Sequence, residues 1–151
     1  MRSEGIFFDP ALFLNIAEKG KIFEDRKTSI LRVYLLTHCI IGESSFYARG
    51  IKRHMETYEE MFIELERLIS DNYEDITLDN KVEFLVCTKL FQKSSYLENR
   101  IFLDTLAAFD NEKQIFLENK KSKIKDAFRK GEHRNVLALM AFYLENRLDK
   151  I

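Results

Sequence analysis

The chain has few of the residues that interrupt regular structure. Among its 151 residues there are one proline, five glycines and no tryptophan, whereas phenylalanine occurs thirteen times. Because proline and glycine mark turns and breaks, their scarcity predicts long helices around an aromatic core. Hydrophobic residues make up 46% of the chain and charged residues 32%, which excludes a disordered tail and indicates a folded globular protein.

Neither sign of charge dominates, and cysteine is rare. The 24 basic and 25 acidic residues give no general charge of the kind that attracts nucleic acid. Cys39 and Cys87 both lie in apolar runs, so we expect buried thiols of a cytosolic protein and neither a disulfide nor metal ligands. No apolar run reaches the roughly 20 residues that cross a bilayer, and Arg2, Glu4 and Asp9 interrupt any N-terminal signal pattern. These absences predict a cytoplasmic protein without a membrane segment.

One helix-length stretch, Ile30–Ile41, is apolar on nearly every side and has Thr37 and His38 in its middle. A helix of this kind is usually the central, buried helix of its domain. Buried hydroxyl and imidazole groups destabilise a fold unless they find hydrogen-bond partners. The polar atoms of Tyr34, Thr37 and His38 are therefore where a structural network or a ligand site would be built.

Elsewhere, apolar residues recur at helical spacing, most cleanly between Met55 and Ile69. Thr77 is placed as an N-cap and Ser95–Glu98 has the capping-box pattern. Residues 110–119 are expected to form a long loop or an irregular turn, and because no period-two alternation appears, we predict no sheet. The expected helices are one from Pro10 to near Gly20, one from near Thr28 through Ile41 to Gly42, one over Met55–Ile69, one after Thr77, one after Ser95, and two over Lys121–Lys130 and His133–Leu148. We predict a single all-α domain over residues 1–151, with six to seven helices in consecutive antiparallel hairpins, as in an irregular helical bundle.

Three motifs resemble an uncharacterised bacterial family of helical domains. Tyr34-Leu35-Leu36-Thr37-His38 resembles a Tyr-x-Leu-Thr-His signature, and Ile76–Cys87 is similar to an Asp-Leu-x-x-Glu-Leu-Leu-Leu-Cys segment with Glu83 at the glutamate. Gly131–Ala138 is similar to a late Tyr-His-Thr segment, onto which His133 alone carries over. The resemblance spans most of residues 30–145 and implies α/α-hairpins like part of an α/α toroid, with no established activity.

The residues of these motifs define a candidate ligand-binding site: Tyr34, Thr37, His38, Glu83 and His133. In a functional interpretation His38 titrates near neutrality at the mouth of a helical cavity, and Glu83 orients or charges it. Two histidines and a carboxylate could hold a divalent metal, but no His-x-x-x-His or Glu-x-x-His spacing supports one, so we predict no metal and no cofactor. In the structural interpretation, which we favour, Thr37 bonds back to a helix carbonyl and His38 is a satisfied core or interface residue.

Lys120–Arg134 is rich in basic residues and contains only Asp126 and Glu132 as acids. A nucleic-acid patch is one interpretation, and a solvated surface helix is the other. Aromatic residues for base stacking are nearly absent there, with Phe128 alone. The surface helix is favoured, and nucleic acid is not a predicted partner.

These observations favour a non-catalytic helical module of bacterial origin that binds a protein or peptide, or itself. If the chain is part of a toroid, the face that a neighbouring hairpin would cover must be met by another chain, which predicts a homo-oligomer. Cys39 and His38 point about 100° apart on a helix and cannot form a nucleophile–base pair. The alternative is a small enzyme or ligand-binding protein that uses His38, as general acid or base, with Glu83.

Overall fold

The computed structural model describes residues 9–19, 26–117 and 124–143, and this part of the chain contains six helices and one two-stranded hairpin. The elements are α1 (Pro10–Lys19), α2 (Arg26–Glu43), α3 (Met55–Asp71), α4 (Leu78–Leu90), α5 (Glu98–Ala107), β1 (Phe109–Asp110), β2 (Ile115–Phe116) and α6 (Ile124–Tyr143). The prediction of an all-α protein is confirmed.

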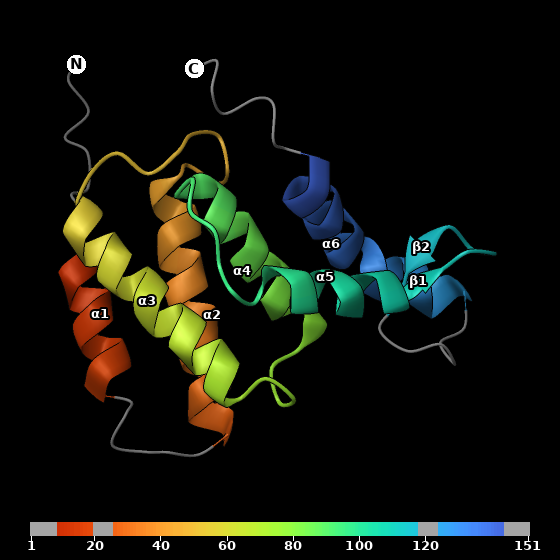
Figure 1. Ribbon diagram of the computed structural model, residues 1–151, viewed down its shortest axis with the longest axis horizontal. Helices are drawn as coiled ribbons and strands as arrows, with labels where there is room; N and C mark the ends of the chain where they lie inside the picture. The colour runs from red at the N-terminus through yellow and green to blue at the C-terminus, as the bar shows by residue number, and fades with distance from the viewer. Residues whose placement is uncertain (1–8, 20–25, 118–123, 144–151) are drawn as a thin grey trace.

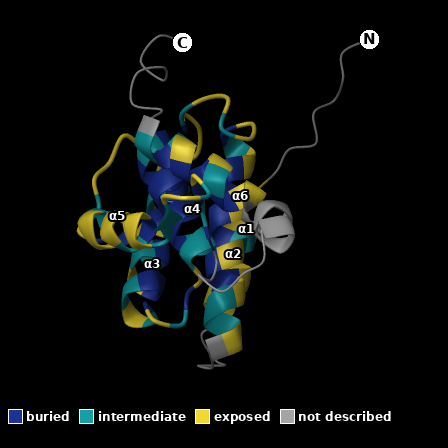
Figure 2. Cartoon of the chain, turned by 90° about the vertical axis from the view of Figure 1, so that its right-hand side faces the viewer, coloured by how far each residue is buried: buried dark blue, intermediate teal, exposed yellow. Residues whose placement is uncertain are grey.

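Helix α4 lies at the centre of the fold. It runs between α2 and α6 in Figure 1, while α1 and α3 pack on α2. Every residue from Lys81 to Thr88 is buried, and Figure 2 shows α4 inside the molecule and α5 with an exposed outer face. Phe84 is fully buried and stacks on Phe62 of α3, with 5.4 Å between ring centroids.

The prediction that Ile30–Ile41 forms the central, buried helix is wrong. This stretch is helical, but Leu31 is 57% exposed and Tyr34 is 53% exposed. The residues between them, Arg32 and Val33, are buried. Helix α2 therefore has one solvent-facing stripe, because α1, α3 and α4 do not surround it completely.

Local chemistry sets the starts of α4 and α5. The Thr77 hydroxyl oxygen accepts a hydrogen bond from the Asn80 backbone N–H at 3.3 Å, which is the predicted N-cap. The Ser95 backbone N–H donates to Glu98 Oε1 at 3.1 Å, which is one bond of the predicted capping box, but the N-cap residue of α5 is Leu97 and has no side-chain capping bond. In place of the other bond, Ser95 Oγ accepts from the Leu97 backbone N–H.

Two predictions for the C-terminal third are wrong. Instead of a loop, β1 and β2 form an antiparallel hairpin with Phe109 opposite Phe116, and strands of two residues are too short to show alternation. Instead of two helices separated at Gly131, α6 is continuous. Glycine costs a helix only about 1 kcal/mol, and the extensive packing of α6 on α4 outweighs that cost. The expected helical residues 121–123 and 144–148 lie outside the described residues.

Both cysteines are free and buried, as the sequence predicts. Within the described ranges, no helix combines the length and the apolar character needed to span a membrane.

Candidate functional site

A buried carboxylate, that of Glu83, lies at the centre of the candidate site. Glu83 is in the middle of α4 and is only 3% exposed. Thr37 and His38 of α2 and His133 of α6 all lie close enough to act on its charge. Residues from three separate segments of the sequence are therefore brought together. We refer to Tyr34, Thr37, His38, Glu83 and His133 as the Glu83 cluster.

Both histidines near the buried carboxylate are exposed to solvent. His133 Nε2 is 3.9 Å from Glu83 Oε1, and the His133 side chain is 62% exposed. His38 is also exposed, its ring stacks on Tyr34 with 3.8 Å between centroids, and its Nδ1 lies 2.9 Å from the Tyr34 carbonyl oxygen. A solvent molecule or ligand can thus reach the imidazoles directly, whereas the side chain of Glu83 is buried.

Thr37 has the backbone bonding expected of a threonine inside a helix. Its hydroxyl is buried and lies 3.0 Å from the carbonyl oxygens of both Val33 and Tyr34. A hydroxyl has one proton, so it donates to one acceptor at a time. His38, in contrast, is no core histidine, because it is exposed and bonds to the backbone at the surface of α2.

Burial dominates the electrostatics of Glu83. Desolvation raises the pKa of its carboxyl above the ordinary value, while His38, His133 and the Thr37 hydroxyl act in the opposite direction. Asp79, one turn earlier on α4, raises the pKa further. The carboxyl is therefore held closer to neutrality than a surface glutamate. Among the described residues, no three His, Cys, Asp or Glu side chains are grouped so that they could hold a metal ion.

Tyr47 belongs to the surroundings of Glu83 and was not found from the sequence. Residues 45–47, directly after α2, have φ angles of 55°, 56° and 69°. Such left-handed residues cost about 1–2 kcal/mol each without glycine. Ser44 holds this turn, because its hydroxyl donates to the Ile41 carbonyl at 2.6 Å and accepts from the Tyr47 N–H at 2.8 Å. Burial, and then the charge of Glu83, raises the pKa of the Tyr47 phenol.

An ion pair beside the cluster was also missed. Arg134 of α6 is 3% exposed, and its Nε donates to Asp79 Oδ1 at 2.5 Å. The pair connects α6 to the first turn of α4, one residue from His133. The assignment of Arg134 to a solvated basic surface is therefore wrong. The side chains of the other basic residues in Lys120–Arg134 lie outside the described residues.

The arrangement can be compared with known protein families. Residues 22–147 match the family DUF3541, a domain of unknown function. The chain belongs to the DUF3541 family. No curated protein and no solved structure is significantly similar to this DUF3541 chain. All five residues of the Glu83 cluster lie inside the matched region of DUF3541.

Proposed function

We propose that this DUF3541 chain is a non-catalytic module that binds a protein or peptide on the surface where α2 and α6 border Glu83 of α4. Exposed apolar side chains lie on both helices that border Glu83. On α2 they are Leu31 and Tyr34, and on α6 Val136 is 49% exposed and follows His133 by three residues. Residues three apart share a helix face, so each bordering helix presents an apolar group beside a histidine.

The observation that supports this proposal most is the burial of the Glu83 carboxyl close to these exposed groups of α2 and α6. A carboxylate out of water is stabilised by a cation or a strong hydrogen-bond donor. Apolar groups around such a contact exclude water and strengthen it. A peptide segment with one lysine or arginine between apolar residues satisfies both requirements. The proposal keeps the expectation of a bacterial, cytoplasmic protein, and two free, buried thiols support the cytoplasmic compartment.

The test is a selection from a phage-displayed random peptide library, followed by titration of a selected peptide. We expect the selected peptides to share one basic residue with apolar neighbours. Glu83→Gln should weaken binding by about tenfold or more, because a charge-assisted hydrogen bond is lost. Glu60→Gln, at an exposed position on α3, is the matched control and should leave the affinity unchanged. Failure to enrich basic peptides, or equal affinity in Glu83→Gln, would overturn the proposal.

A second copy of the chain is one form that the partner can take, and this form is the homo-oligomer that the sequence predicts. Native mass spectrometry of the purified protein decides this point. A dimer that dissociates in Leu31→Glu would identify the second copy as the occupant of the α2 border. A dimer unchanged by that variant would place self-association on another surface, and a monomer would leave the peptide as the partner.

The second candidate function is a small enzyme with His38 as general acid or base and Glu83 as its partner. The raised pKa of Glu83 beside two imidazoles favours it, because perturbed titrating groups gather at active sites. His38→Asn separates the two functions. A binding module should tolerate this change if packing is kept, whereas an enzyme should lose turnover.

A further inference from the structure

A pocket between α4, α5 and α6 lies apart from the Glu83 cluster. It has a volume of about 170 Å³, and no residue of the Glu83 cluster lines it. An apolar cavity of about 150 Å³ in another protein holds a benzene molecule. The pocket is thus large enough for one ring-sized or branched apolar group, with further atoms extending toward its rim.

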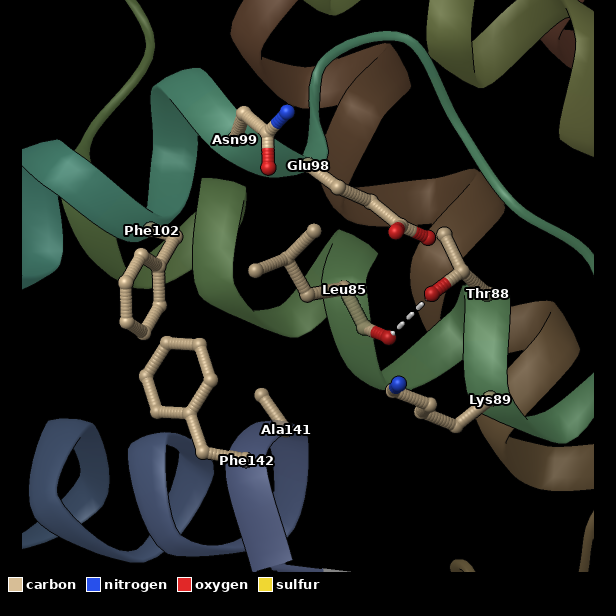
Figure 3. Close-up of a pocket in the computed structure, with 8 residues that line it drawn as sticks. All are labelled: Leu85, Thr88, Lys89, Glu98, Asn99, Phe102, Ala141 and Phe142. Atoms are coloured by element: carbon tan, nitrogen blue, oxygen red, sulfur yellow. Dashed lines mark hydrogen bonds between the residues drawn. The ribbon is translucent and has the colours of Figure 1, made fainter. Parts of the chain in front are cut away.

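One end of the pocket is apolar. The rings of Phe102 on α5 and Phe142 on α6 meet edge to face, with 5.1 Å between centroids and 81° between planes. Leu85 and Ala141 complete this end, as Figure 3 shows. Phe102 is 40% exposed, so an apolar ligand group placed against it would remove aromatic surface from water.

The other end is charged. Figure 3 shows the Glu98 carboxylate and the Lys89 ammonium on the side of the pocket away from the two rings, with Thr88 between them. Glu98 Oε1 accepts one backbone N–H, from Ser95, but a carboxylate has about four acceptor sites. An ammonium has three donors, so Lys89 can bind a ligand in addition to its interaction within the protein. The Thr88 hydroxyl is used within the protein, because it donates to the Leu85 carbonyl at 2.7 Å.

We propose that this pocket binds a small zwitterion with an apolar side chain, that is, a free α-amino acid of the leucine or phenylalanine class. Its ammonium group would bind Glu98 and its carboxylate would bind Lys89. Its side chain would lie against Phe102 and Phe142. The pocket presents one positive group, one negative group and one apolar surface, and a ligand with the complementary three groups uses all of them. This proposal is independent of the function assigned to the Glu83 cluster.

The test is a titration of the full chain with L-phenylalanine and L-leucine, followed by ¹H–¹⁵N NMR. We expect saturable shifts confined to the pocket residues of α4, α5 and α6. Three probes each lack one group: 2-phenylethylamine lacks the carboxylate, 3-phenylpropionate lacks the ammonium, and glycine lacks the side chain. Each should bind about tenfold more weakly or not at all. Equal affinity for 2-phenylethylamine, or the absence of saturable shifts, would overturn the proposal.

Variants connect the binding to these side chains. Glu98→Gln should weaken L-phenylalanine binding by about tenfold, because the charge is lost while an acceptor for the Ser95 N–H is kept. Phe102→Ala should weaken it to a similar extent. Glu60→Gln removes the same charge from an exposed position on α3 and should have no effect. If Glu98→Gln folds normally by circular dichroism and binds as tightly as the unmodified chain, the assignment of the ammonium to Glu98 is wrong.

Discussion

Helices α2 and α4 are both rich in apolar residues, yet they are buried to different extents. Helix α4 packs against α2, α3, α5 and α6, and all residues from Lys81 to Thr88 are buried. Helix α2 packs against α1, α3 and α4 and leaves a stripe with Leu31 and His38 exposed. Polar groups on the two helices therefore differ in character. Glu83 on α4 is forced out of water, whereas His38 on α2 keeps its contact with solvent.

The largest effect that would test this difference is a loss of core volume on α4. Phe84→Ala removes a fully buried ring that stacks on Phe62, and we expect it to lower the free energy of unfolding by about 3–5 kcal/mol. Leu31→Ala on the exposed stripe of α2 should change it by less than about 0.5 kcal/mol. Urea denaturation measures both. Similar losses in the two variants would show that the helices do not differ in this way.

A smaller effect concerns the charge that α4 buries. Because the folded-state pKa of Glu83 is raised, the folded chain holds this proton more tightly than the unfolded chain does. The stabilisation is present below the unfolded pKa of about 4.3 and is lost as the pH rises through the folded pKa. Glu83→Gln does not titrate at this position. Its stability relative to the unmodified chain should therefore rise with pH from about 4.3 upward.

This trend is measured by determining the denaturant midpoints of both proteins at intervals between about pH 4 and pH 8. The groups acting on Glu83 are His38 from α2, His133 from α6 and Asp79 from α4. If the relative stability of Glu83→Gln fell with increasing pH, the two imidazoles would outweigh burial. The carboxylate would then be stabilised in its charged form.

The smallest expected effect is at the C-terminal end of α2. A methyl group added at Gly42 meets no atom within 4 Å, and Gly42 is exposed. Gly42→Ala should therefore stabilise the chain by about 0.5–1 kcal/mol, because alanine loses less backbone entropy in a helix. Thermal unfolding followed by circular dichroism measures the gain as a higher Tm. A lower Tm would contradict this expectation, because it would show that a methyl group does not fit at the C-terminal end of α2.

Helix starts could be predicted because their causes are local. Pro10 begins α1, and the Thr77 hydroxyl caps α4 within three residues of its own position. The continuity of α6 through Gly131 could not be predicted in the same way. It depends on packing against α4, which is distant in sequence. The hairpin β1–β2 is too short for any periodic signal.

The sequence predicted which residues belong to the candidate site but not how they are arranged. Short motifs selected Thr37, His38, Glu83 and His133, and the fold brings these four together. No motif indicated Tyr47, because its left-handed turn contains no glycine and is held by a serine hydroxyl.

The sequence by itself determined that the chain is helical, where most helices begin, and which polar residues interrupt its apolar segments. These properties follow from composition, spacing and capping, which act over a few residues. Only the tertiary structure decided that α4 and not α2 is central, that Glu83 is buried close to two exposed imidazoles, and that Arg134 pairs with Asp79. The burial and the pKa of a carboxyl depend on how many neighbouring elements exclude water from it. Those neighbours are distant in sequence, so they cannot be predicted from the local sequence.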